Sequence, residues 1–299
     1  MKALFNPSNP QDSALGKLER EKGTDYWGLH KWSVEQPGEF WSRAWDELGL
    51  IGEKGDINYA PAQKFIDAKF FPNGSINVAE NLLAHGKGVA MIGILEDGTR
   101  TEISYEELRV KSAAVAAAMR ELGIVAGDRV VAWVPNLPEV MIYALGALSI
   151  GAIVSTASPD FAPHAVEDRF GQVDPKLILL GDNYQYAGKT FDLKDKGDEI
   201  IALLPTLKKS LRISEFESWI APHIGAKPEY NRLPFDHPGF VLFSSGTTGK
   251  PKCITHSGAG VMLKAGAEQI YQFDMKPGEN VFFFTTCGWM MWNWLFMSL

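Results

Sequence analysis

A regular alternation of strands and helices between residues 89 and 205 is the sequence feature that most restricts the fold. Short apolar runs, which we predict as strands, stand near residues 91–95, 128–134, 152–156 and 177–180. Segments with helical patterning follow them near residues 104–122, 137–150, 163–172 and 192–205. Because strands that alternate with helices of this length form parallel sheets covered on both faces, we predict an α/β fold with a doubly wound parallel sheet. Ligands of such sheets bind beyond the carboxyl ends of the strands.

Local signals support this alternation. Asp97-Gly98 is a strong turn signal and predicts a hairpin between residues 91–95 and the strand that ends before Ser104. Ser104 and Glu107 have the spacing of a capping box, which predicts the start of a long helix, and Gly123 predicts its end. Residues 140–159 carry no charge, but their glycines and β-prone end indicate a buried helix followed by a buried strand rather than a membrane span.

The first 88 residues have a different character. Residues 1–35 are polar and rich in turn formers, and we expect Trp27 and Trp32 to pack as anchors on a later surface. Residues 36–50 have helical spacing that predicts a packed stripe of Phe40, Trp41 and Trp45. An extended segment over 54–74 and a short helix over 77–85 complete this part.

The stretch FVLFSSGTTGKPKCITH, residues 240–256, is the most informative about function. It begins with an apolar run that predicts a buried strand, and residues 253–255 again have strand character. Between them lies a loop with the residue types that hold a polyphosphate: Ser244, Ser245, Gly246, Thr247, Thr248, Gly249, Lys250, Pro251 and Lys252. Glycines let the backbone approach an anion, hydroxyls and N–H groups donate to its oxygens, and lysine supplies positive charge.

This loop has two other possible interpretations, a P-loop and a solvated loop without a ligand. A P-loop needs four residues between its glycines and a helix after its lysine, whereas here two residues separate Gly246 from Gly249 and proline follows Lys250. A solvated loop without a ligand is common between secondary-structure elements, but it does not require two lysines on either side of a proline. We therefore predict a phosphate-binding loop.

Composition limits the partners. Among 299 residues, 45% are hydrophobic and 22% are charged, which is typical of a folded globular chain. The net charge of −7 argues against general affinity for nucleic acid or anionic membranes, and we expect small-molecule substrates instead. Two cysteines and six histidines form no disulfide framework or zinc pattern, and the N-terminus has no apolar signal segment, so a cytoplasmic location is expected.

The string SSGTTGKPK resembles the phosphate loop of the adenylate-forming acyl-CoA synthetases, whose pattern is [ST]-[ST]-G-[ST]-[ST]-G-x-P-K. The surrounding chain resembles the acetoacetyl-CoA synthetase branch of that family, in FFPNGSINVAENLL at 70–83, in PNLPEVMIYALGALSIGAIVS at 135–155 and in FFFTTCGWMMWNW at 282–294. The resemblance covers roughly residues 35–299. It implies the N-terminal part of an acid–thiol ligase that uses ATP with Mg²⁺ to form an acyl-adenylate and then transfers the acyl group to coenzyme A.

The resemblance also implies roles for individual residues. Residues 244–252 would bind the β- and γ-phosphates of ATP, with Thr248 and Lys252 as the catalytic pair and Lys250 as either a contact or a solvated lysine. Trp289, Met290 and Met291 stand where the acyl pocket of the family begins, and flexible methionines suit an acid slightly longer than acetate. A plain buried helix start is the alternative for each methionine. His256 could orient a substrate, but a structural role is the commoner one for such a histidine.

The sequence departs from the acetyl-CoA synthetase pattern in two places that concern coenzyme A. Ser158-Pro159-Asp160-Phe161 replaces a glycine-rich turn, and Tyr186 and Lys189 replace two arginines. Lys189 could still meet a phosphate of coenzyme A, although lysine binds phosphate only as a point charge. No metal ligand is predicted in this chain.

We divide the chain into a cap over residues 1–88, a first α/β unit over 89–235 and the start of a second over 236–299, with a strand over 281–286 and a helix from Trp289 in the last. The acidic motif, the ribose-binding aspartate, the hinge and the C-terminal lysine of the family have no counterpart before Leu299. We therefore expect this chain to be inactive alone. A synthetase for acetate or propionate, or a non-catalytic nucleotide-binding fragment, remain the alternatives.

Overall fold

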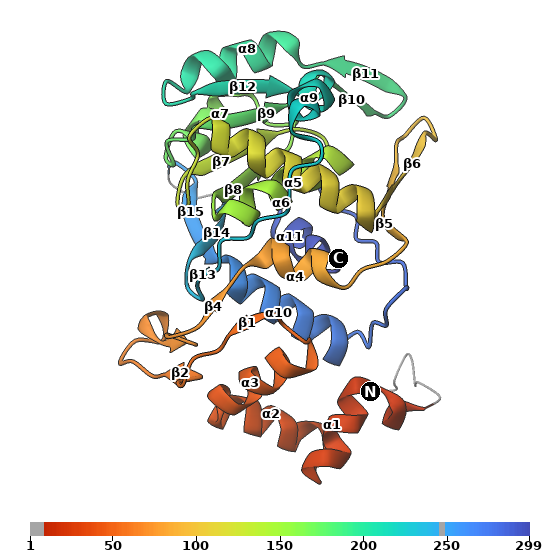
Figure 1. The fold of residues 1–299 in the computed structure, drawn as a ribbon, viewed down its shortest axis with the longest axis vertical. Coiled ribbons are helices and arrows are strands. Elements are labelled where there is room, and N and C mark those ends of the chain that lie inside the picture. Colours follow the sequence, from red (N-terminus) through yellow and green to blue (C-terminus); the bar gives the residue numbers. More distant parts are fainter. Residues whose placement is uncertain (1–8, 245–248) are drawn as a thin grey trace.

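The computed structural model describes residues 9–244 and 249–299, and a six-stranded sheet forms its centre (Figure 1). In spatial order the strands are β12 (Lys209–Arg212), β9 (Leu177–Leu180), β7 (Arg129–Trp133), β8 (Ile153–Ala157), β14 (Pro238–Ser244) and β15 (Lys252–Ser257). The first five strands run parallel to their neighbours, and β15 pairs antiparallel with β14. The predicted parallel α/β sheet is confirmed.

Helices cover both faces of this sheet. One face packs on α5 (Tyr105–Glu121), α6 (Pro138–Ile150) and α9 (Ile213–Ile220), and the other packs on α7 (Pro163–Phe170) and α8 (Lys194–Leu203). Val130 and Ala132 of β7 belong to the first core, whereas Val131 and Trp133 belong to the second, and all four are completely buried. Burial on both faces explains why these strands are continuous apolar runs in the sequence.

The predicted start of the long helix α5 is confirmed in its main contact. The Ser104 hydroxyl accepts a hydrogen bond from the Glu107 amide at 3.1 Å, which satisfies one of the free N–H groups of the first turn. The hairpin predicted across Asp97-Gly98 is formed by β5 (Val89–Ile94) and β6 (Arg100–Ser104). The uncharged residues 140–159 form the buried helix α6 and strand β8, as predicted. No helix within residues 9–244 and 249–299 is long and apolar enough to cross a membrane.

The N-terminal part is more helical than the sequence suggested. It contains η1 (Pro10–Asp12), α1 (Ala14–Lys22), α2 (Tyr26–Glu35), α3 (Pro37–Glu47) and α4 (Val78–Ala84). Ser13 and Asp25, interpreted as turn formers, are N-caps that accept hydrogen bonds from the backbone amides of Gly16 and Gly28. The anchor role predicted for Trp27 is wrong, because this side chain is 71% exposed on α2.

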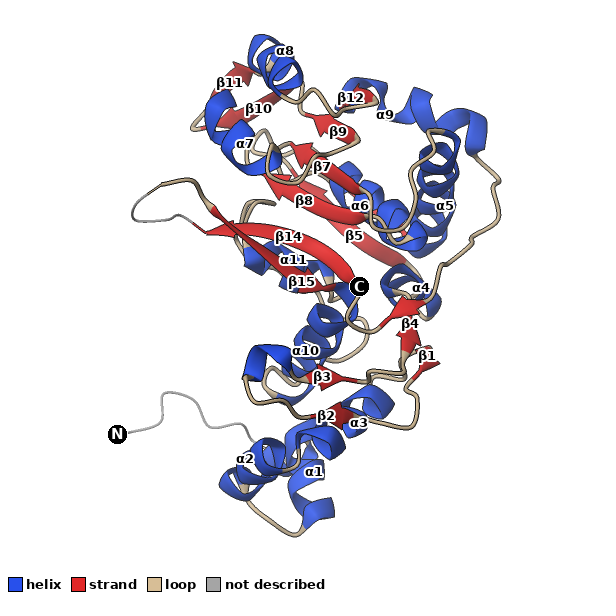
Figure 2. Ribbon diagram, turned by 90° about the vertical axis from the view of Figure 1, so that its left-hand side faces the viewer, coloured by secondary structure: helices blue, strands red, loops and turns tan. Residues whose placement is uncertain are grey.

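Short strands connect these helices to the body of the molecule. They are β1 (Gly52–Glu53), β2 (Tyr59–Ala60), β3 (Lys69–Phe70), β4 (Ser75–Ile76) and β13 (Leu233–Pro234), with the single turn η2 (Phe65–Asp67) before β3. Strand β4 lies between β1 and β13, so it ties residues near 52 and 233 together. Figure 2 shows the N-terminal helices α1 to α3 beneath α10 (Gly258–Tyr271), at the end of the molecule away from α8.

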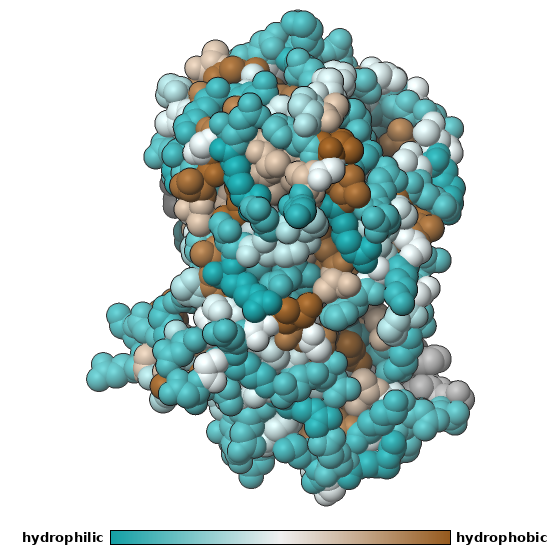
Figure 3. Space-filling model, viewed as in Figure 1, coloured by the Kyte–Doolittle hydropathy of each residue, from teal (hydrophilic) through white to brown (hydrophobic). Residues whose placement is uncertain are grey.

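Several elements were missed or misplaced by the sequence analysis. The hairpin β10 (Asn183–Tyr186) and β11 (Lys189–Asp192), the strand β12, the helices α9 and α10 and the turn η3 (Ala221–His223) were not predicted. The strand predicted over residues 281–286 is wrong, because this segment contains no strand in the structure. The helix predicted from Trp289 is α11 (Met290–Phe296). On the face drawn in Figure 3 the surface is largely hydrophilic, with small separate apolar areas.

Candidate functional site

The predicted phosphate loop connects the carboxyl end of β14 to the start of β15. Ser244 and Lys252 lie opposite each other in the antiparallel register, so the residues between them close this hairpin. Figure 2 shows that β14 ends on the same side of the sheet as β7 and β8. Of the predicted loop residues, Ser245, Gly246, Thr247 and Thr248 lie outside the described residues. Because β14 ends on that side of the sheet, the loop starts at the edge where ligands of such folds bind.

Helix α7 supports the second half of this loop. The Gln172 side chain, just after α7, donates to the backbone oxygen of Pro251 at 2.9 Å. Lys250 Nζ lies 3.8 Å from Asp168 Oδ1 of α7, and 74% of the Lys250 side chain is exposed. Such an exposed pair contributes little to stability, but it gives Lys250 a partner within the protein. Sequence analysis missed Asp168 and Gln172, because their positions on α7 carry no signal that relates them to a loop 80 residues later.

Lys252 differs from Lys250 in its surroundings. It is the first residue of β15 and its side chain is exposed. Among residues 9–244 and 249–299, no carboxylate lies within 4 Å of its ammonium group. A strand holds its backbone, so its side chain starts from a fixed point beside the loop. Lys252 can therefore offer its full charge to an anion, whereas Lys250 would first have to leave Asp168.

The predicted acyl-site residues Trp289, Met290 and Met291 belong to a segment, residues 285–293, that lies at the same edge of the sheet. Thr156 of β8 donates a hydrogen bond to the Cys287 backbone oxygen, and the Cys287 thiol donates to the Val134 oxygen at 3.1 Å. At Gly288 a Cβ atom would lie 3.2 Å from the Ser158 nitrogen, so the two backbones are in close contact. The segment is therefore fixed against the carboxyl ends of β7 and β8.

Asn136, directly after β7, holds the segment from a second side. Its side-chain oxygen accepts a hydrogen bond from Trp292 Nε1 at 3.0 Å, and its amide nitrogen donates to the Thr285 oxygen at 3.4 Å. Sequence analysis gave Asn136 no role in the site. Its place after a parallel strand was the signal that could have marked it, because such positions meet at the ligand-binding edge.

The three predicted acyl-site residues differ in exposure. Trp289 is 69% exposed and Met290 is 51% exposed, although the backbone just before them is held at Cys287 and Gly288. Met291 is partly buried and packs against the main core. Trp289 and Met290 are thus free to contact a further group. Met291 packs against the core and follows them directly in the chain.

Cys287 and His256 have structural surroundings. Burial raises the pKa of the Cys287 thiol to about 12, so it is a hydrogen-bond donor rather than a nucleophile. His256 lies opposite Phe240 in the β14–β15 pair, and partial burial lowers its pKa. Neither residue adds a reactive group to the candidate site.

The structure does not bring Lys189 to the phosphate loop. Lys189 and Tyr186 form the paired ends of the exposed hairpin β10–β11, whose Gly188 amide donates to Glu96 at 2.8 Å. Figure 1 shows this hairpin beside β6 and well separated from β15. Among the described residues, no group of three or more His, Cys, Asp or Glu side chains could hold a metal ion.

The parallel sheet, with the predicted phosphate loop and the segment 285–293 at its carboxyl edge, is the architecture of an α/β protein that binds its ligand beyond the ends of its strands. The family model "AMP-binding enzyme" matches residues 79–299, and the model "Acetyl-coenzyme A synthetase N-terminus" matches residues 26–82. The chain belongs to the AMP-binding enzyme family.

Individual relatives indicate which members of this family the chain is similar to. The chain is 42% identical over 294 residues to the acetoacetyl-coenzyme A synthetase of Rhizobium meliloti (strain 1021), covering 92% of this chain and 45% of the relative. It is 34% identical to the acetoacetyl-CoA synthetase of Rattus norvegicus, covering 99% of this chain and 49% of the relative. The solved structure of acetoacetyl-CoA synthetase from Streptomyces lividans superimposes with a TM-score of 0.90 at 29% identity, covering 97% of this chain and 48% of that chain. The chain thus spans about half the length of the relatives that it matches.

Proposed function

We propose that this chain is the ATP-binding and acid-selecting half of an enzyme that joins acetoacetate to coenzyme A. The overall reaction converts acetoacetate, ATP and coenzyme A to acetoacetyl-CoA, AMP and pyrophosphate. The observation that supports the proposal is that the loop after β14 and the segment that carries Trp289, Met290 and Met291 both lie at the carboxyl edge of the sheet. The similarity to acetoacetyl-CoA synthetases supports the choice of acid.

In the first half-reaction, a carboxylate oxygen of acetoacetate attacks the α-phosphorus of ATP and pyrophosphate leaves. Charge accumulates on the leaving phosphates, and a fixed cation beside them stabilises it more in the transition state than in the bound substrate. We assign this role to Lys252, with Thr248 and the other hydroxyls and amides of residues 244–249 as donors to the β- and γ-phosphates. Lys250, already beside Asp168, has at most a secondary role.

In the second half-reaction, the sulfur of coenzyme A attacks the acyl carbon, loses its proton and displaces AMP. Lys189 is our candidate for a contact with a phosphate of coenzyme A, because it is an exposed cation on a hairpin that directly follows the carboxyl end of β9. Mg²⁺ would accompany ATP, and residues 9–244 and 249–299 hold no cluster of three or more His, Cys, Asp or Glu side chains for it. Two unpaired thiols, Cys253 and Cys287, favour a reducing cytoplasm as its location.

We assign the choice of acid to Trp289, Met290 and Met291. The segment that carries them is held by Asn136 and Thr156, so their side chains start from a fixed stretch of backbone. A pocket wall of thioethers and an indole ring suits the additional carbonyl and methyl groups of acetoacetate better than a wall of small residues would. Acetate or propionate would leave part of such a pocket unfilled.

Replacement of both methionines tests this assignment in the complete enzyme. The double variant Met290→Val, Met291→Thr should change the ratio of kcat/KM for acetoacetate and acetate by roughly 10- to 200-fold, the usual effect of altered apolar contacts with a small substrate. Met275→Val, a partly buried methionine outside the segment, should leave the ratio unchanged. A folded double variant with the wild-type ratio would assign Met290 and Met291 to packing. Absence of acetoacetate-dependent AMP formation by the complete wild-type enzyme would contradict the proposed function itself.

A further inference from the structure

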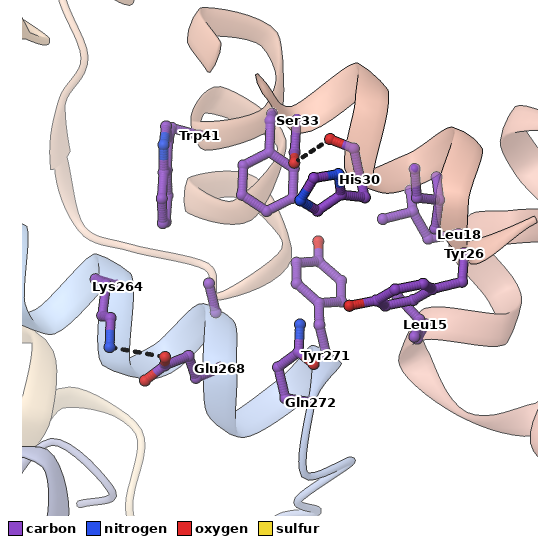
Figure 4. A pocket seen from close by; sticks show the side chains of 13 residues that line it. Leu15, Leu18, Tyr26, His30, Ser33, Trp41, Lys264, Glu268, Tyr271 and Gln272 are labelled. Atoms are coloured by element: carbon purple, nitrogen blue, oxygen red, sulfur yellow. Dashed lines mark hydrogen bonds and ion pairs between the residues drawn. The ribbon is translucent and has the colours of Figure 1, made fainter. Parts of the chain in front are cut away.

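A cavity of about 300 Å³ lies between the N-terminal helices and α10, apart from the candidate functional site (Figure 4). Helices α1, α2 and α3 form one side, and the C-terminal half of α10 forms the other. Four aromatic side chains line it: Tyr26, Phe40, Trp41 and Tyr271. Its volume is at the lower end of the range for small-molecule sites, and its walls have the mixture of apolar surface and few polar groups that such sites share.

Tyr271 places an unpartnered hydroxyl in this cavity. The residue is 6% exposed, and among residues 9–244 and 249–299 its hydroxyl has no hydrogen-bond partner. Figure 4 shows the hydroxyl directed from α10 toward the N-terminal helices. Burial raises the pKa of Tyr271 to about 12, so the phenol is protonated at neutral pH. Arg43 is close enough to affect this pKa, but its N–H groups bind Glu21 and Glu47 and no well-formed hydrogen bond joins it to Tyr271.

Three other polar residues of the cavity have partners within the protein, while Tyr26, His30 and Gln272 add further polar atoms to its lining. Lys264 and Glu268 form an ion pair at 2.7 Å, and Glu268 also accepts a hydrogen bond from Trp294 Nε1 at 3.1 Å. The Ser33 hydroxyl donates to the His30 backbone oxygen at 2.8 Å. Since the carboxylate and the ammonium group neutralise each other, this pair offers no net charge to an ionic ligand. The Tyr271 hydroxyl is a buried donor without a partner, and such a donor costs free energy until an acceptor lies opposite it.

We propose that this cavity is a second ligand site, which binds a small neutral aromatic molecule with one carbonyl oxygen. The ring would lie among Tyr26, Phe40 and Trp41, where edge and offset contacts between aromatic rings are favourable. The carbonyl would accept the Tyr271 hydroxyl. This site is independent of the proposed ligase function, because none of its lining residues belongs to the β14–β15 loop or to residues 285–293.

Two matched probes test the proposal on the whole chain: 4-fluoroacetophenone, which has the carbonyl, and 4-fluorotoluene, which lacks it. Titration followed by ¹⁹F NMR should show saturable binding of 4-fluoroacetophenone with a Kd on the order of 1 mM, as expected for so few heavy atoms. Tyr271→Phe keeps the ring and removes the hydroxyl. It should weaken 4-fluoroacetophenone by about three- to tenfold, the usual net effect of one hydrogen bond, and leave 4-fluorotoluene unchanged.

A variant that fills the cavity locates the site. Ser33→Phe adds a ring on the cavity side of α2 and should abolish binding of both probes, whereas Val34→Phe adds the same ring on the 65% exposed neighbouring position and should not. Equal affinity of 4-fluoroacetophenone for the wild-type chain and Tyr271→Phe would overturn the proposed contact. Binding that survives in Ser33→Phe, or no saturable binding to the wild-type chain, would overturn the site.

Discussion

Two apolar runs of nearly the same composition adopt different structures in this molecule, since one forms a strand and the other does not. Residues 240–243, Phe-Val-Leu-Phe, form the middle of β14, between β8 and β15. Residues 281–284, Val-Phe-Phe-Phe, form no strand. Phe240 is 1% exposed, whereas Phe282 and Phe284 are 82% and 91% exposed. Both runs have high β propensity, so the difference comes from the presence of hydrogen-bond partners and a covering layer, on which strand stability depends.

This contrast also separates the two halves of the candidate site. The loop after β14 is held by the register of a sheet. Residues 285–293 follow the unpaired run and are held through contacts of Asn136, Thr156 and Cys287, together with packing of Trp292 in the core. One half is therefore positioned by backbone pairing, and the other by a few side-chain contacts.

The largest effect on stability is expected when one phenylalanine of each run is replaced by alanine. Phe240→Ala should lower the free energy of unfolding by about 3–5 kcal/mol, because it removes a fully buried ring and leaves a cavity. Phe284→Ala should change it by less than about 0.5 kcal/mol, as expected for an exposed side chain. Guanidinium unfolding followed by circular dichroism measures both values. A similar cost for the two variants would show that residues 281–284 are buried in the protein in solution.

A smaller effect is expected at the contact that fixes residues 285–293. Asn136→Ala leaves the N–H of the buried Trp292 without a partner, so it should lower the free energy of unfolding by about 1–3 kcal/mol. Hydrogen exchange in residues 287–293 should become faster, while exchange in β7 to β9 should not change. Asn280→Ala, at an exposed position, is the matched control. Unchanged exchange in Asn136→Ala would mean that this segment is held by other contacts.

The smallest effect on stability, but a clear difference in reactivity, is expected at the two cysteines. Cys253 is exposed on β15, while Cys287 is buried with its pKa raised to about 12. The thiolate is the reactive form, so iodoacetamide at pH 8 should modify Cys253 and spare Cys287 in the native protein. Mass spectrometry should show one adduct before and two after denaturation, and Cys253→Ser should remove the native adduct. Rapid native modification of Cys287 would contradict its burial against Val134.

Much of the fold was predictable where local patterns and tertiary partners agree. The strand at Leu177–Leu180 has its predicted bounds, and the α5 cap at Ser104 forms as expected, because continuous apolar runs and caps are local signals. The strand predicted over 281–286 failed because a local pattern does not show whether a neighbouring strand exists. Helix α10 was missed because three glycines, at 258, 260 and 266, lower its helix propensity, which packing then overrides.

The candidate site was predictable in part for the same reason. Its loop was located by a nine-residue motif, and the structure places Lys252 opposite Ser244 at the sheet edge. The difference between Lys250 and Lys252 was not predictable, since it depends on Asp168, which lies about 80 residues earlier in the chain. The roles of Asn136 and Thr156 likewise depend on contacts with residues about 130 to 160 positions later.

The central claim, that the hairpin between β14 and β15 presents Lys252 to the phosphates of ATP, is tested most directly by the kinetics of two lysine variants in the complete enzyme. Lys252→Ala should lower kcat/KM for ATP by roughly 10- to 150-fold, through both a higher KM and a lower kcat, because it removes a charge-assisted contact of about 1.5–3 kcal/mol. Lys250→Ala, the matched control beside Asp168, should lower it by less than about threefold. Wild-type kinetics for Lys252→Ala, or equal losses in the two variants, would contradict the account.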